Sequence, residues 1–145
     1  MLDDRQRCQR NLAYDVARNR FAPRVLILED EVLIAIDLQE TLHEAGLVDI
    51  VTCHRLVDAQ AAAESQSFDL AFLDHMIGLK SSIDVGHRLA QKSTQVAFMS
   101  GSDRGEVANL PRTSLFLPKP YSERQILSVV KSVISDAKSV RPERP

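Results

Sequence analysis

Short apolar segments alternate with amphipathic ones along most of this chain. Five segments are short, unpatterned and rich in apolar residues, as expected for strands that are buried on both faces: Arg24–Leu28, Val48–Cys53, Leu70–Leu73, Gln95–Met99 and Ser114–Leu117. Four segments favour helices: Val32–Ala45, Val57–Glu64, Ile83–Gln91 and Ser122–Ala137. Because parallel strands need crossover connections, this alternation predicts an α/β fold with a doubly wound, five-stranded parallel sheet.

Local signals set several of the helix boundaries. Ser122 and Gln125 form a capping box before the last helix, and four apolar residues then recur on one helical stripe: Ile126, Val130, Val133 and Ala137. The segment between Met99 and Ser114 reads SGSDRGEVANLPRT and is poor in apolar residues. We therefore expect the fourth helix of the alternating pattern to be short or irregular.

The two ends of the chain differ from its middle. Residues 1–22 contain five arginines and three aspartates, with four apolar residues at helical spacing: Leu12, Ala13, Val16 and Ala17. This N-terminal extension is either a short amphipathic helix or a solvated leader. Residues 139–145 are polar and contain two prolines, so we expect a flexible tail. The predicted domain spans residues 23–138.

Composition and charge narrow the class of protein. The chain has 145 residues, of which 44% are apolar and 26% charged, as in one ordinary globular domain. The longest apolar runs are too short for a membrane span, and the charged N-terminus resembles no secretory signal, so we expect a cytoplasmic protein. A formal net charge of −2 and the absence of tryptophan argue against a nucleic-acid partner. Cys8 and Cys53 lie too far apart in sequence to suggest a metal site.

Candidate chemistry lies just beyond the predicted strands. In an open α/β sheet, ligands bind outside the carboxyl ends of the strands. Those positions hold three acids after the first strand, one acid after the third, a hydroxyl after the fourth and a lysine after the fifth: Glu29, Asp30, Glu31, Asp74, Ser100 and Lys119. Parallel strands would bring all of them to one edge of the sheet.

These residue types together suit magnesium-assisted phosphoryl transfer. Neighbouring carboxylates repel one another, and Mg2+ relieves that repulsion because it prefers oxygen ligands. Lys119 adds a positive charge suited to phosphate oxygens, and the hydroxyl of Ser100 can donate to a phosphoryl oxygen. The pattern thus points to a site that places a phosphoryl group on Asp74.

Each of these residues also has a structural reading. Glu29, Asp30 or Glu31 can cap the helix that follows, and Asp74 can be an ordinary turn residue. Ser100 can be a helix cap, and Lys119 can be a solvated side chain. The functional reading rests on their joint placement at strand ends.

Four motifs resemble the receiver domain of two-component response regulators. They are VLILEDE, LAFLDH, VAFMSG and LPKPYS, at the first, third, fourth and fifth strands, and their order and spacing are similar to the family's. The resemblance covers residues 24–138. It implies a flavodoxin-like (βα)5 receiver fold.

The resemblance also assigns a metal site. It implies that Asp74 is the phosphoacceptor and a metal ligand, and that Asp30 is a direct ligand of Mg2+. Glu29 would bind the cation directly or through water, and the backbone carbonyl of Met76 would complete the protein ligands.

Switch residues follow from the same resemblance. Ser100 matches the hydroxyl that moves toward the phosphoryl group, and Lys119 matches the lysine that contacts it. Phe116 stands at the switch-aromatic position and has no hydroxyl. The Lys119–Pro120 bond is where the family carries a cis peptide.

Departures from the common pattern point to a subgroup. Gly78 stands where the family has proline, and Ser82 stands where it has glycine. With Leu110–Pro111 after the fourth strand, the chain resembles the FAT GUY subgroup, which is associated with HWE/HisKA2-type histidine kinases.

The resemblance implies a signalling phosphoacceptor, not an enzyme. We expect a single-domain response regulator that takes its phosphoryl group from a sensor histidine kinase. It would then signal through a downstream protein partner, or pass the group to a phosphotransfer protein in a phosphorelay. The serious alternative is a pseudo-receiver that binds protein partners without phosphorylation. A nucleotide-binding enzyme is disfavoured because neither GxxxxGK nor GxGxxG occurs.

Overall fold

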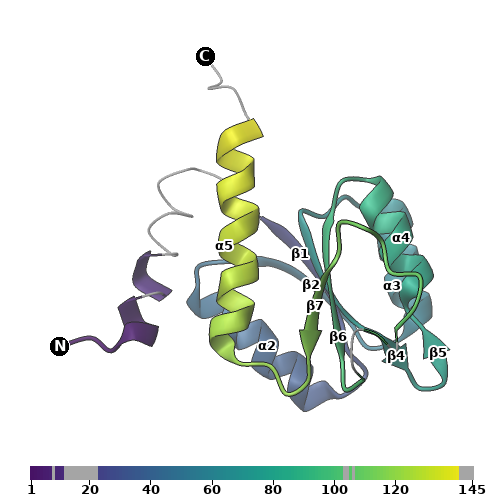
Figure 1. Ribbon diagram of the computed structural model, residues 1–145, viewed down its shortest axis with the longest axis horizontal. Helices are drawn as coiled ribbons and strands as arrows, with labels where there is room; N and C mark the ends of the chain where they lie inside the picture. The colour runs from purple at the N-terminus through teal and green to yellow at the C-terminus, as the bar shows by residue number, and fades with distance from the viewer. Residues whose placement is uncertain (8, 12–22, 103–104, 106, 141–145) are drawn as a thin grey trace.

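A five-stranded parallel sheet forms the centre of the protein (Figure 1). The computed structural model describes residues 1–7, 9–11, 23–102, 105 and 107–140. Across the sheet, the strands follow the order β2 (Asp49–Cys53), β1 (Arg24–Leu28), β3 (Leu70–Asp74), β6 (Gln95–Ser100) and β7 (Leu115–Pro118). All four neighbouring pairs are parallel, which confirms the predicted doubly wound receiver fold.

Helices cover both faces of this sheet (Figure 1). Helices α2 (Val32–Glu44) and α5 (Glu123–Val140) pack on one face, and α3 (Leu56–Ser65) and α4 (Ile83–Gln91) pack on the other. Within the described part of the chain, no helix combines the length and apolarity that a membrane span requires.

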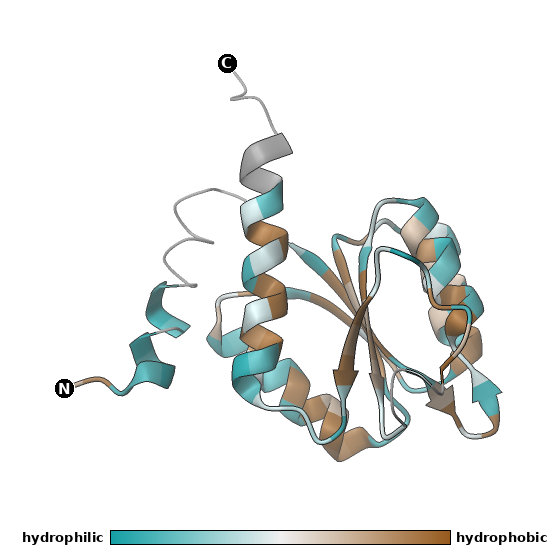
Figure 2. Cartoon of the chain, in the orientation of Figure 1, coloured by the Kyte–Doolittle hydropathy of each residue, from teal (hydrophilic) through white to brown (hydrophobic). Residues whose placement is uncertain are grey.

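The interior positions of the central strands are apolar because each face of the sheet has its own core. In β1, Val25 and Ile27 belong to the core under α2 and α5, while Leu26 and Leu28 belong to the core under α3 and α4. All four side chains are fully buried. Figure 2 shows the strands as the most hydrophobic part of the fold. This two-sided burial explains why the strand segments show no alternation in the sequence.

Most element boundaries agree with the predictions to within three residues. Ser122 and Gln125 form the expected capping box: the Gln125 N–H donates to Ser122 Oγ at 3.1 Å, and the Ser122 N–H donates to Gln125 Oε1 at 2.7 Å. Helix α5 begins directly afterwards, at Glu123.

A small hairpin was not predicted from the sequence. Strands β4 (Met76–Ile77) and β5 (Lys80–Ser81) pair in antiparallel fashion between β3 and α4. Gly78 lies in the turn with φ of 61°, a conformation that glycine adopts without steric cost. Each strand has only two residues, which is too short for a detectable alternation of apolar and polar positions.

The described part of the connection between β6 and β7 is irregular, as expected. Its described residues, 101, 102, 105 and 107–114, contain no α-helix.

At the N-terminus, Asp3 and Gln6 make reciprocal capping hydrogen bonds at the start of a short helical turn. The apolar stripe expected from Leu12 to Ala17 and the tail from 141 to 145 lie outside the described residues. The domain boundaries at 23 and 138 stay predictions.

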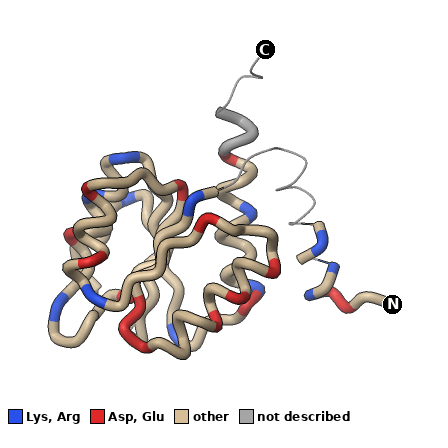
Figure 3. The backbone as a smooth tube through the Cα atoms, turned by 180° about the vertical axis from the view of Figure 1, so that it is seen from behind, with Lys and Arg blue, Asp and Glu red and all other residues tan. Residues whose placement is uncertain are grey.

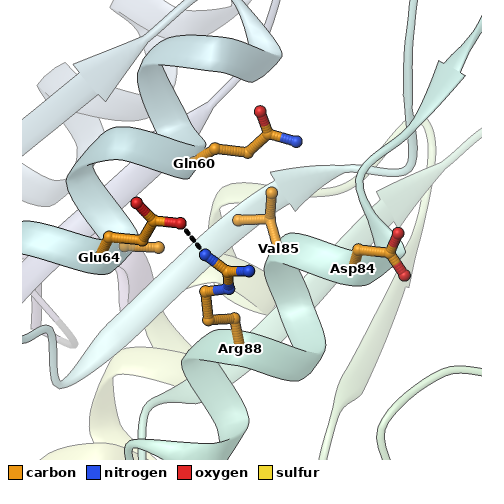
Figure 4. Close-up of a pocket in the computed structure, with 6 residues that line it drawn as sticks. Gln60, Glu64, Asp84, Val85 and Arg88 are labelled. Carbon is orange, nitrogen blue, oxygen red and sulfur yellow. Dashed lines mark hydrogen bonds and ion pairs between the residues drawn. The ribbon is translucent and has the colours of Figure 1, made fainter.

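Helices α3 and α4 lie side by side and are linked by charge. Arg88 on α4 points toward Glu64 on α3 and forms an ion pair with it (Figure 4).

The main chain of α4 approaches β6 closely at Gly86. A β-carbon built on Gly86 would stand 2.3 Å from Cζ of Phe98, a fully buried ring. Glycine is therefore required at this helical position by close packing.

Gly86→Ala should destabilise the fold. The added methyl group has no space beside Phe98, and overpacking of this kind costs about 1–3 kcal/mol, more than alanine gains in helix propensity. Urea unfolding followed by circular dichroism measures the difference. Gly105→Ala is the matched control, because a β-carbon added to Gly105 would have no atom within 4 Å. Equal midpoints for the two variants would contradict the packing argument.

Candidate functional site

The strand register brings the acidic residues to one edge of the sheet. In the β1–β3 pair Leu28 lies opposite Leu73, so Glu29 and Asp74 follow as neighbours at the carboxyl ends of adjacent strands. Carboxylate oxygens of Glu29, Asp30 and Asp74 all lie within 4.8 Å of one another. The run of acids after β1 lies at one edge of the molecule (Figure 3). The structure therefore joins three of the acids that the sequence singled out.

Lys119 completes this cluster from the end of β7. Its Nζ donates to Glu29 Oε2 at 3.1 Å and to Asp74 Oδ2 at 3.2 Å. Its backbone N–H donates to the carbonyl of Ser100 at 2.7 Å, which fixes the chain after β7 against the end of β6. The Lys119–Pro120 bond is cis, as the resemblance implies.

Glu29 has an unusual electrostatic environment. Its side chain is fully buried, and burial, together with the negative charge of Asp74, raises the pKa of Glu29 to about 7. Hydrogen bonds from Lys119 and from the N–H of Glu31 oppose this shift without cancelling it. A buried carboxylate that resists ionisation would be stabilised by a further positive charge.

The same cluster favours the charged form of Lys119, whereas it disfavours the charged form of Glu29. Burial alone would lower the pKa of Lys119, but the nearby carboxylates of Asp74 and Glu29 outweigh burial and raise it. The lysine is therefore held in its charged form. Tyr121, two residues further on, lies half-buried, and burial and nearby carboxylates raise its pKa to about 12.

The exposure of the acids decreases from the rim inward. Asp30 is exposed, Asp74 is 8% exposed and Glu29 is fully buried. Asp30 Oδ2 accepts a hydrogen bond from the backbone N–H of Gly78 at 3.3 Å. The donor set consists of carboxylate oxygens open to solvent on one side. These residues fit a hard cation such as Mg2+, which prefers oxygen ligands and keeps several waters.

The capping alternative fails for the acids after β1. Helix α2 has Glu31 at its N-cap, and this residue makes no side-chain capping hydrogen bond. Instead its backbone N–H donates to Glu29 Oε1 at 3.2 Å. The carboxylates of Glu29 and Asp30 are turned toward Asp74, within the cluster.

The structure places the remaining predicted residues, Ser100, Met76 and Phe116, on the strands β6, β4 and β7. Ser100 ends β6, is 5% exposed, and accepts a hydrogen bond from the Ser102 N–H at 3.1 Å. Met76 begins β4 beyond Asp74 and its side chain is 40% exposed. Phe116 is half-buried and packs on the core under α3 and α4. Their roles stay predictions.

Sequence reasoning missed three contacts at this edge. The hydroxyl of Ser82 donates to the backbone carbonyl of Asp74 at 2.6 Å. Nδ1 of His54 lies 2.9 Å from the carbonyl oxygen of Glu29. The third is the bond from the Gly78 N–H to Asp30. Each depends on a loop conformation, and the only sequence signal was that Gly78 and Ser82 depart from the family pattern.

Other hollows of the surface lack such convergence. The groove between α3 and α4 has a volume of about 270 Å³, and its arginine is already paired with Glu64 while Asp84 points away from that pair (Figure 4). A second hollow of about 530 Å³ adjoins the acid cluster and is lined mainly by apolar groups, including Leu33 and Tyr121. Among these three places in the described part of the chain, only the acid cluster brings several carboxylates together with a lysine.

Several known proteins are similar to this chain. It is 29% identical over 116 residues to the transcriptional regulatory protein PdtaR of Mycobacterium tuberculosis; the match covers 77% of this chain and spans 57% of the relative's length. A response regulator receiver protein from Sinorhizobium medicae has a TM-score of 0.71 at 20% identity, over 79% of this chain and 95% of that one. The signal receiver domain of a putative LuxO repressor protein from Vibrio parahaemolyticus has a TM-score of 0.71 at 25% identity, over 82% and 95%.

A family model gives the same result over most of the domain. The model of the response regulator receiver domain matches residues 25–131, which include the whole sheet except Arg24, together with the acid cluster and Lys119. The residues assembled at the strand ends are those that the resemblance in the sequence had selected. The chain belongs to the family of response regulator receiver domains of two-component signalling.

Proposed function

We propose that this receiver takes a phosphoryl group from the phosphohistidine of a sensor histidine kinase onto Asp74. The observation that carries the proposal is the cluster of three carboxylates within 4.8 Å of one another, with Lys119 bound to two of them. Receiver domains act as signalling phosphoacceptors rather than as conventional enzymes. An intact cluster of this kind favours phosphorylation over a pseudo-receiver role.

Each residue of the site would have its own role in phosphoryl transfer. A carboxylate oxygen of Asp74 attacks phosphorus, so that the P–O bond forms while the P–N bond to the donor histidine breaks. Lys119 Nζ already lies 3.2 Å from Asp74 Oδ2, and it is placed to donate to an oxygen of the incoming group. Glu29 and Asp30, with Asp74 and the carbonyl of Met76, would hold Mg2+. The bound cation would offset charge on the phosphoryl oxygens.

Phosphorylation would change the shape of the surface beyond β6. The product carries about one more negative charge than the aspartate it replaces. Ser100 and Phe116 are the residues proposed to respond, the first by approaching the phosphoryl group and the second by turning inward. The irregular connection after β6 would follow them, because it begins at Ser100 and leads to β7. A phosphoryl group can drive this change only by binding better to one of two existing states.

The proposed output is through protein contacts. The phosphorylated receiver would bind a downstream protein or pass its phosphoryl group to a phosphotransfer protein. The subgroup resemblance points to an HWE/HisKA2-type kinase as the donor. The regulatory role of PdtaR in transcription is a property of that relative, of which this chain spans 57%.

Asp74→Asn should abolish phosphorylation. Incubation of the wild-type chain with acetyl phosphate and Mg2+ should add the mass of one phosphoryl group, and chelation of the metal with EDTA should prevent it. Intact-mass spectrometry measures both results. Asp84→Asn is the matched control, because Asp84 lies on α4 and is not part of the acid cluster, so this variant should be labelled like the wild type. Labelling of Asp74→Asn, or none of the wild type, would refute the proposal.

Glu29→Gln should change how stability depends on pH in the absence of metal. Because the pKa of Glu29 is raised from 4.5 to about 7, the folded state holds its proton more tightly than the unfolded state. Wild-type stability should therefore fall between pH 4.5 and 7 by about 3 kcal/mol relative to Glu29→Gln, whose amide does not ionise. Urea unfolding in EDTA at several pH values tests this. A constant difference between the two proteins would contradict it.

Met76→Asn should shorten the lifetime of the phosphoryl group. The Met76 side chain stands two residues beyond Asp74 at the rim, where an apolar group hinders the approach of water and an amide can hydrogen-bond it. The decay of labelled protein after removal of acetyl phosphate gives the lifetime, and we expect it to fall several-fold. Leu79→Asn serves as the control, since Leu79 is fully exposed at the hairpin tip. Identical decay for Met76→Asn and the wild type would exclude the effect.

A further inference from the structure

Ser82 makes an unexpected connection to the main chain of Asp74. It occupies the N-cap of α4, and its residue is completely buried. An N-cap serine normally accepts a hydrogen bond from an N–H of the first helical turn. Here the side chain makes no such bond, and its hydroxyl donates backward to the carbonyl of Asp74 at 2.6 Å. The capping role passes to Ser81, whose Oγ accepts from the Ile83 N–H at 3.2 Å.

The same residue closes the loop that contains the hairpin. The backbone N–H of Ser82 donates to the carbonyl of His75 at 2.9 Å, and the N–H of His75 donates to the carbonyl of Met99 at 2.9 Å. Between these ends, Met76 pairs with Ser81 in the hairpin. The loop therefore leaves β3 after Asp74 and returns to Asp74 through the hydrogen bond from Ser82.

This closed loop reaches the acid cluster at two points. Met76, whose carbonyl is a proposed ligand of the cation, lies in β4 directly after the tied end. The Gly78 N–H donates to Asp30 Oδ2 at 3.3 Å. A shift of the loop would therefore move a proposed ligand and change the contacts of a second one. Loss of the Ser82 hydroxyl would also remove a hydrogen-bond partner from the carbonyl of Asp74, which is costly when the partner is buried.

We propose that Ser82 is a positioning residue of the phosphorylation site. Its hydroxyl fixes the main chain at Asp74 and the loop that bears Met76, and thereby sets the affinity for Mg2+ and the rate of phosphorylation. Glycine, which the family pattern has at this position, offers no such bond, so the link belongs to this chain. The effects on Mg2+ binding and on phosphorylation rest on the proposed function, whereas the hydrogen bond from Ser82 to Asp74 belongs to the structure itself.

Metal binding by variants of Ser82 provides the test. Isothermal titration of metal-free protein with Mg2+ should show about fivefold weaker binding for Ser82→Ala and Ser82→Gly than for the wild type, as expected from the loss of one buried hydrogen bond. The initial rate of labelling by acetyl phosphate at saturating Mg2+ should fall by a similar factor. Ser82→Gly accompanies Ser82→Ala because it leaves no methyl group in the buried space.

Ser81→Ala is the matched control for these variants. It removes the hydrogen bond that caps α4 and leaves the bond to Asp74 in place. We expect its Mg2+ affinity to stay within twofold of the wild type. If Ser81→Ala weakens binding as much as Ser82→Ala, then loosening of the helix start explains the effect and the proposal is wrong. Wild-type affinity in both Ser82 variants would overturn it as well.

A measurement on the unaltered protein guards against variants that do not fold. A buried hydroxyl that donates a short hydrogen bond gives a slowly exchanging proton signal in NMR, and this signal should be coupled to Ser82 in the metal-free wild type. Its absence would overturn the proposal. Failure of the wild type to accept a phosphoryl group would refute the proposed function, whereas the NMR and metal-binding results would still decide the role of Ser82.

Discussion

Mutual repulsion among the carboxylates at the ends of β1 and β3 is the constraint on which the site depends. The parallel register of these strands makes Glu29 and Asp74 neighbours, and Asp30 follows Glu29 at the exposed rim. Lys119 offsets part of this repulsion through two hydrogen bonds at 3.1 and 3.2 Å. Burial and, after it, the charge of Asp74 keep the pKa of Glu29 raised although Lys119 donates to its carboxylate. The remaining negative charge is what a cation would offset in the proposed function.

The cores of the fold hold this unfavourable arrangement in place. Phe72 in β3 and Ile27 in β1 are fully buried beneath α2 and α5, and Leu73 and Leu28 are fully buried beneath α3 and α4. Apolar burial on both faces of the sheet stabilises the strands by far more than a few charges at one end can destabilise them. The main chain at Glu29 and at Asp74 therefore cannot move apart without disruption of the β1–β3 pair. This arrangement keeps the site assembled before any ligand arrives.

The sequence predicted the sheet and the acid cluster because both depend on strong, local signals. Unbroken apolar runs such as residues 25–28 identified strands buried on two sides, and the strand ends then determined where Asp74 and Lys119 would meet. The hairpin of Met76–Ile77 and Lys80–Ser81 had no such signal, since two-residue strands show no period. The direction of the Ser82 hydroxyl was equally hidden, because serine at an N-cap ordinarily bonds forward into its own helix.

The loop after β3 shows how local departures from a family pattern can act together. Gly78 permits the tight turn of the hairpin through its positive φ, and the turn places the Gly78 N–H on Asp30. Ser82 ties the other end of the loop to Asp74, where glycine would leave the carbonyl without this donor. A loop without proline at position 78 gains freedom in its middle, and the serine hydroxyl restricts that freedom at its end. The two differences from the common pattern therefore act on the same segment, which links Asp74 to α4.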